Sequence, residues 1–138
     1  HYKNGILASM KRWGIVDGAN GFNFTDYYKN PKVSYTNASN KLERIIGQKW
    51  IALWLNVEPW FDYRRTGYPA LKTGSVTQYG PALPLRFMYP MPNQDQRYLV
   101  NYNTAVDRLE STSYVPSGQS KDHNYSKIWV VQNTGKPY

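Results

Sequence analysis

The sequence contains no cysteine, and its two histidines, His1 and His123, stand near opposite ends of the chain. Disulfide bonds and thiolate metal sites are therefore excluded, and cysteine usage says nothing about the redox compartment. Neither histidine has a second histidine or a helically spaced carboxylate beside it, so the sequence does not favour a zinc site or a catalytic histidine. We predict that the protein uses no metal and no cofactor.

Long apolar runs are also missing. No stretch approaches the roughly 20 apolar residues that a membrane-spanning helix needs. The chain shows neither a signal peptide nor a cysteine for lipid attachment. We therefore expect any attachment to a membrane to come from sequence outside this chain.

Acidic residues are few, with 9 Asp and Glu against 17 Lys and Arg, which gives a formal net charge of +8. A basic balance of this size suits nucleic-acid binding when the cations cluster, because clustered cations neutralise phosphates. Here no basic run exceeds two residues, as in Lys11-Arg12 and Arg64-Arg65. We predict a dispersed, solvated basic surface and no nucleic-acid partner.

The residue patterns of the common catalytic sites are absent, including phosphate-binding glycine loops and nucleophile elbows. A glycoside hydrolase needs two carboxylates about 5 to 9 Å apart. Glu58 and Asp62 have a helical spacing, but Pro59 between them leaves their shared face uncertain. The positive charges of the neighbouring Arg64 and Arg65 favour the ionised form of Asp62 over the protonated form that a general acid needs. We predict that the protein is not an enzyme, and we rank hydrolysis last among the alternatives.

The strongest helical pattern in the chain begins at Leu42, where apolar residues recur at three-and-four spacing. Thr36, Asn37 or Ser39 can cap this helix. Pro59 suits the start of a second, shorter helix, which Gly67 can end in the left-handed conformation. The apolar face of the first helix comprises Leu42, Ile45, Ile46, Lys49, Trp50, Leu53, Trp54 and Val57. This face is apolar enough to require burial, and we expect Trp50 and Trp54 to pack in the core.

The rest of the chain predicts a mainly α fold with long ordered loops. An opening helix presents an apolar face from Tyr2 to Trp13, and Gly14 ends it. The remaining segments are a helical turn from Thr25 or Asp26 to Lys29, a loop at 72–84, a short extended piece at 85–89, one or two helical turns at 101–108, a ligand-lining or mobile surface loop at 110–126 and an apolar strap at 128–131.

Four segments, in order along the chain, resemble motifs of the SusD/RagB family of outer-membrane nutrient-binding lipoproteins. They are YKNPKV at 28–33, QKWIAL at 48–53, WFDYRRTGYP at 60–69, and PLRFMYP at 84–90 followed by NYN at 101–103. We expect these signature residues to serve the scaffold. They include Gln48, Lys49, Trp50, Trp60, Asp62, Arg64, Arg65, Gly67, Tyr68, Pro69, Arg86, Tyr89 and Pro90.

The resemblance covers roughly residues 5–131 and implies that residues 1–138 form one C-terminal portion of a SusD/RagB-like domain. It implies a helical core with the TPR-related α-α architecture of the full-length family. It also implies a surface-exposed lipoprotein of the outer membrane, anchored by an N-terminal lipid outside this chain. Such a protein binds an oligosaccharide, starch-like or otherwise, and delivers it to a SusC-like TonB-dependent transporter.

Sugar binding needs flat aromatic faces and polar groups that bond hydroxyls. The chain has five tryptophans and thirteen tyrosines. We predict that four tyrosines in expected loops, Tyr79, Tyr98, Tyr114 and Tyr125, are exposed and contact ligand. Two further alternatives stay open besides hydrolysis, namely a peptide ligand in the manner of RagB, or a scaffold and transporter-docking role with the ligand site elsewhere.

Overall fold

The computed structural model describes residues 1–71, 82–91 and 95–132. The chain divides into two compact units, His1–Tyr63 and Arg64–Tyr138, and each is described by itself. Within the described residues the regular structure is helical, with five α-helices, one 3₁₀ turn and no β-strand. The expected mainly α fold is confirmed. No helix in these residues is long and apolar enough to cross a bilayer.

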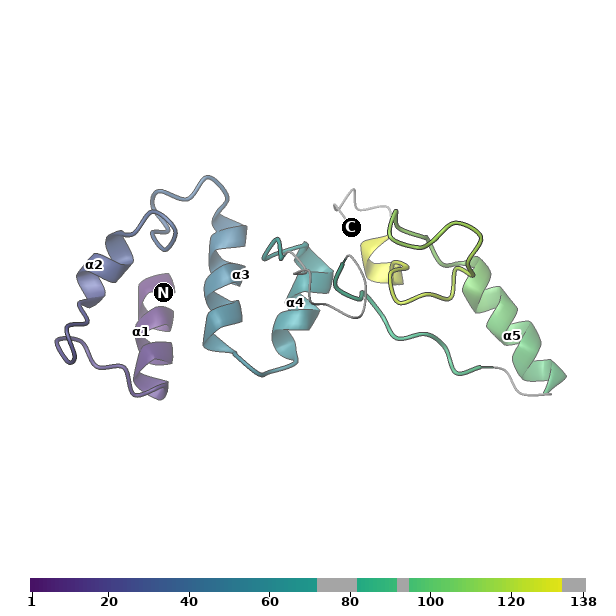
Figure 1. Ribbon diagram of the computed structural model, residues 1–138, viewed down its shortest axis with the longest axis horizontal. Helices are drawn as coiled ribbons and strands as arrows, with labels where there is room; N and C mark the ends of the chain where they lie inside the picture. Colours follow the sequence, from purple (N-terminus) through teal and green to yellow (C-terminus); the bar gives the residue numbers. More distant parts are fainter. Residues whose placement is uncertain (72–81, 92–94, 133–138) are drawn as a thin grey trace. The chain divides into compact units, whose positions relative to one another are not determined.

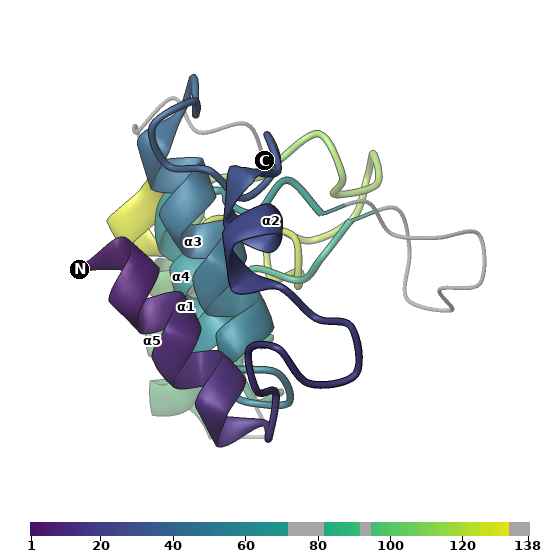
Figure 2. The ribbon, with the colours of Figure 1, turned by 90° about the vertical axis from the view of Figure 1, so that its left-hand side faces the viewer.

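The first unit is built on α1 (Tyr2–Arg12), α2 (Phe24–Lys29) and α3 (Lys41–Ala52). α1 and α3 contact each other and lie side by side (Figures 1 and 2). Gly14 follows α1 with a φ of 74°, a conformation that glycine adopts without strain, as the sequence predicts. The predicted turn before Lys29 is also present, as the slightly longer α2.

A small core holds α1, α2 and the segment before α3 together. It consists of Ile6, Phe24 and Val33, with the rings of Tyr2 and Tyr28 packed against it. The Tyr2 hydroxyl donates to the Val33 carbonyl at 2.6 Å. Because this bond joins residues 31 positions apart, it fixes the start of α1 to the connection between α2 and α3.

The helix α3 differs from the expectation at both ends. The Asn40 side chain caps it by accepting a hydrogen bond from the Glu43 N–H, so the predicted caps at 36, 37 and 39 are wrong. The helix ends at Ala52, well before Pro59, and the backbone then turns through Leu55 at a φ of 65°. This left-handed residue breaks the periodic pattern before the proline can.

The apolar face expected on α3 is only partly buried. Ile46 belongs to the core, whereas Leu42, Ile45, Trp54 and Val57 are exposed. The prediction that Trp54 packs in the core is wrong, because Trp54 lies beyond the end of the helix with 61% of its surface exposed. The helix buries one edge against α1 and leaves the rest of its apolar face open.

The helix α4 (Glu58–Thr66) begins in the first unit and ends in the second, where Gly67 takes the predicted left-handed conformation. The second unit also contains α5 (Gln96–Asp107) and the 3₁₀ turn η1 (Trp129–Val131). The turn or two expected at 101–108 is thus a longer helix, capped by Asp95, whose carboxylate accepts from the Arg97 N–H. The range 72–81 of the expected loop lies outside the described residues.

The segment from 110 to 126 is not the uniformly exposed loop that its composition suggests. Residues 116–121 are exposed, but Thr112, Asp122, Tyr125 and Ser126 are buried. A backbone bridge between Glu110 and Lys127 closes the segment. The apolar strap behind it buries Val131 and leaves Trp129 exposed.

Candidate ligand-binding surfaces

An ion-pair cluster joins α3 to α4 through residues of the family signature. The Lys49 ammonium lies 2.7 Å from the buried carboxylate of Asp62 and 3.4 Å from that of Glu58. The hydrogen bond to Asp62 is the main cause that raises the pKa of Lys49. Both carboxylates of the hypothetical hydrolase pair therefore lie against one ammonium, and this ion-pair geometry favours the structural interpretation.

A second network lies in the other unit, around the buried Arg86 and Asp122. The guanidinium donates to Asp122 Oδ1 at 2.6 Å, and the Tyr89 N–H donates to the same oxygen at 3.1 Å. The Tyr102 hydroxyl donates to Oδ2 at 3.1 Å. Burial by itself raises the pKa of Asp122, but the bonds from Arg86, Tyr89 and Tyr102 outweigh it and hold that pKa below its usual value. The carboxylate therefore stays charged, and its hydrogen bonds connect residue 122 to the segment 86–89 and to Tyr102 on α5.

The other signature residues differ in burial and in their contacts. The Gln48 side chain accepts from the Tyr27 hydroxyl at 3.3 Å, and an Arg64 nitrogen donates to the Leu85 carbonyl at 3.4 Å. Tyr68 and Pro69 are joined by a cis peptide bond. Trp50 and Trp60 are half-buried, whereas Arg65 and Pro90 are exposed. The contacts of Gln48 and Arg64 lie within their own units, and the scaffold role of the signature residues stays a prediction.

Three of the four tyrosines predicted as exposed ligand contacts lie in described residues, and Tyr79 lies outside them. Tyr98 sits on α5 rather than in a loop and is 36% exposed, with its hydroxyl donating to the Pro90 carbonyl. Tyr114 and Tyr125 form an edge-to-face pair, with ring centroids 6.2 Å apart. Within this pair Tyr114 is the exposed ring, with 40% of its surface accessible.

The expectation that Tyr125 is an exposed aromatic is wrong, since 6% of its surface is accessible. Its carbonyl accepts from the Thr112 hydroxyl at 2.8 Å, and its ring lies against that of His123. The loop folds back on itself here, which composition alone does not indicate.

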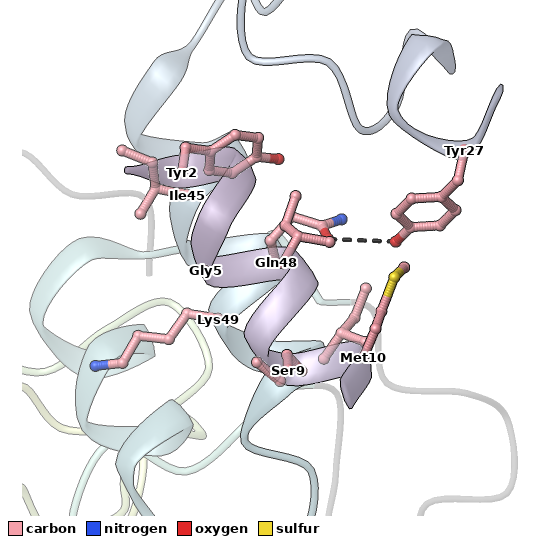
Figure 3. A pocket seen from close by; sticks show the side chains of 11 residues that line it. Tyr2, Gly5, Ser9, Met10, Tyr27, Ile45, Gln48 and Lys49 are labelled. Atoms are coloured by element: carbon pink, nitrogen blue, oxygen red, sulfur yellow. Dashed lines mark hydrogen bonds between the residues drawn. The ribbon is translucent and has the colours of Figure 1, made fainter. Parts of the chain in front are cut away.

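A groove of about 280 Å³ lies between α1 and α3 (Figure 3). Small residues of α1, Gly5 and Ser9, leave space opposite Ile45 and Ala52, and most of the lining is carbon. The ammonium of Lys49 points away from Tyr27, whose hydroxyl is occupied by Gln48. A sugar placed here would bury hydroxyl groups with few partners, which is costly.

A second, smaller hollow of about 130 Å³ lies where α3 ends and α4 begins. We call it the tryptophan cleft, and its lining comprises Trp50, Leu53, Trp54, Leu55, Asn56, Pro59 and Trp60. Three indole rings thus surround one shallow space, and the most exposed of them belongs to Trp54. The cleft offers flat apolar faces next to one primary amide.

The turn between the two helices sets the positions of the cleft residues. The Asn56 N–H donates to the Leu53 carbonyl at 2.9 Å, and the Asn56 Oδ1 accepts from the Glu58 N–H at 3.0 Å. Asn56 thereby caps α4. Periodicity alone did not indicate this cleft, although a capping asparagine shortly before Pro59 is a signal that the first helix ends early.

Within the described residues, no group of three or more His, Asp or Glu side chains could hold a metal ion. The described residues thus form a helical framework that carries hollows and buried ion pairs, and the fold class is all-helical.

Comparison with known proteins then gives the family. Residues 1–90 match the SusD-like family described as starch-binding, associating with outer membrane. That match covers more than half of the chain, and the protein belongs to this family. No curated protein matches the chain.

A solved structure described as a Bacteroidetes AC2a SusD-like protein superimposes with a TM-score of 0.60 at 26% sequence identity. The similarity covers 82% of this chain and 23% of that one, so the chain spans about a quarter of the length of its structural relative. The expected SusD-like helical fold is therefore confirmed, and the family is one associated with starch binding at the outer membrane.

Proposed function

We propose that this protein binds an oligosaccharide noncovalently at the cell surface and delivers it to a SusC-like TonB-dependent transporter. The observation that carries the proposal is the family match over residues 1–90, a family described as starch-binding and associated with the outer membrane. In this proposal an N-terminal lipid outside the chain provides the membrane anchor, and no covalent chemistry takes place. Affinity would come from aromatic stacking and orientation from hydrogen bonds.

Tyr98 and Tyr114 are proposed contacts of this ligand, because each keeps more than a third of its surface exposed. Tyr125 is proposed as the buried ring that holds Tyr114 in place through their edge-to-face contact. Tyr79 completes the proposed set.

The test is a titration of the chain with soluble oligosaccharides of different linkages, beginning with maltoheptaose, and with short peptides, followed by tryptophan fluorescence and by calorimetry. Saturable binding of one glycan class is expected. Binding of peptides alone would instead support a peptide-binding protein in the manner of RagB.

A second candidate function is a scaffold that docks the transporter while the ligand binds elsewhere in a longer protein. It is favoured by the signature side chains Lys49, Asp62 and Arg86, which all engage partners inside their own unit. The distinguishing result is a longer parent protein that binds glycan while this chain does not. Delivery is tested separately, by asking whether the parent protein copurifies with the transporter from detergent-solubilised outer membranes.

A further inference from the structure

We propose that the tryptophan cleft is a binding subsite for a single pyranose ring of the oligosaccharide, with Trp54 as the stacking platform. This inference rests on the proposed function and adds the place and chemistry of one contact. Its first support is shape, since three indoles line a hollow of about 130 Å³. Pockets that enclose whole drug-sized ligands measure about 300 to 1,000 Å³, so this cleft suits one partly exposed ring.

The second support is the pairing of flat and polar groups. A pyranose has an apolar face that stacks on an aromatic ring and an edge of hydroxyl groups that need hydrogen-bond partners. Asn56 uses its side-chain oxygen to cap α4, so its NH₂ group is the part that can donate to a sugar hydroxyl. Fixing the oxygen also fixes the amide plane, which orients that donor before ligand arrives.

The third support is the exposure of the turn itself. Trp54 and the neighbouring Leu55 are 61% and 90% exposed, and Leu55 holds a left-handed backbone angle that costs a leucine about 1–2 kcal/mol. Strained backbone residues cluster at ligand-contacting sites, and contiguous exposed apolar side chains are a feature of interaction surfaces. The strain is maintained by the bonds of Asn56 on the following residue.

The location within the chain also favours this cleft. Residues 50–60 lie inside the segment that matches the starch-binding family description, whereas Tyr98, Tyr114 and Tyr125 lie beyond it. The larger groove between α1 and α3 also lies inside the matched segment, but it is lined by the aliphatic side chains of Ile6 and Ile45 and by tyrosine rather than tryptophan rings. The tryptophan cleft is a hollow in the matched segment where three indole rings lie beside a primary amide.

The experiment measures binding of maltoheptaose and cellohexaose to the whole chain by isothermal titration calorimetry, with Trp54→Ala as the main variant. Loss of a stacking ring is expected to weaken binding about five- to tenfold. Trp54→Phe keeps a flat ring and is expected to retain most of the affinity. Trp129→Ala removes another exposed tryptophan, outside the cleft, and is expected to bind like wild type.

Each outcome decides the proposal. Selective weakening by Trp54→Ala, with unchanged circular dichroism, supports the subsite. Equal binding by wild type and Trp54→Ala overturns the subsite and leaves the proposed function standing. If the wild-type chain binds neither probe while a longer parent protein binds one, the subsite is overturned and the function still stands. If neither protein binds any oligosaccharide, both proposals fail.

Discussion

The buried pair of Arg86 and Asp122 gives the sharpest test of how this structure is stabilised. Their side chains keep 6% and 4% of their surface exposed, and the carboxylate accepts three hydrogen bonds. Asp122→Asn removes the negative charge and leaves the Arg86 guanidinium charged in the interior. Because an unpaired buried charge is poorly solvated, the variant should lose about 3–5 kcal/mol of unfolding free energy.

Urea denaturation followed by circular dichroism measures this loss. A typical domain has about 5–15 kcal/mol of stability in total, so the predicted loss should lower the urea midpoint severely or unfold the second unit. The control is Asp26→Asn, which breaks the ion pair with Lys29. Since both side chains are more than 70% exposed, that change should cost about 1 kcal/mol or less.

A double variant separates charge from packing. Arg86→Met combined with Asp122→Leu replaces the pair by apolar side chains, and it should recover much of the stability that Asp122→Asn loses. A loss below about 1 kcal/mol in Asp122→Asn would refute the reasoning, because it would mean that the charge of Arg86 is compensated without this carboxylate.

The same carboxylate predicts a pH dependence. Bonds from Arg86, Tyr89 and Tyr102 hold the pKa of Asp122 below its unfolded value, which is about 3.9. The contribution of Asp122 to stability is therefore fully present above that value and is lost as the pH falls through the lower folded pKa. The urea midpoint of wild type should fall in this acid range, and the fall should be smaller in Asp122→Asn.

Three further substitutions test the first unit by the same urea assay. Leu55→Gly should raise stability by about 1 kcal/mol, because glycine adopts the left-handed angle freely and the leucine side chain is exposed. Val16→Gly, at an exposed position without that angle, should instead lower it by about 0.5–1 kcal/mol, and equal effects would contradict the strain argument. Lys49→Met should cost about 1–3 kcal/mol, because it removes the ammonium from the buried carboxylate of Asp62. Because the pKa of Lys49 is raised in the folded protein, its stabilising contribution should persist up to about pH 10 and disappear as the pH rises through the folded pKa. A urea midpoint of wild type that falls between pH 7 and 9 would argue against this contribution.

Local signals predicted the helices well. Periodicity and glycine positions placed α1, its end at Gly14 and the left-handed Gly67 after α4. Such features depend on a few neighbouring residues, so the information lies within one or two turns of the chain. The same reasoning placed the end of α3 too late, because the left-handed angle at Leu55 has no local signal in the residue itself.

The sites were harder to predict than the helices. Composition suggested that Tyr125 is exposed, whereas a fold of the 110–126 segment buries it beside His123 and leaves Tyr114 outside. Periodicity suggested that Trp54 is packed, whereas an early helix end exposes it. In both cases the exposure of the side chain depends on the backbone conformation of a nearby turn. Amino-acid composition and periodicity do not specify that conformation.

The sequence by itself determined the mainly α architecture, the SusD-like signature and the absence of cysteine chemistry, because these follow from residue types and short spacings. Only the tertiary structure decided that Arg86 meets Asp122, which lies 36 residues away, that Lys49 serves both Glu58 and Asp62, and that three tryptophans share one cleft. Partners of this kind are selected when distant segments pack together, and the free energy of burying a charge or a ring depends on that packing rather than on its neighbours in sequence.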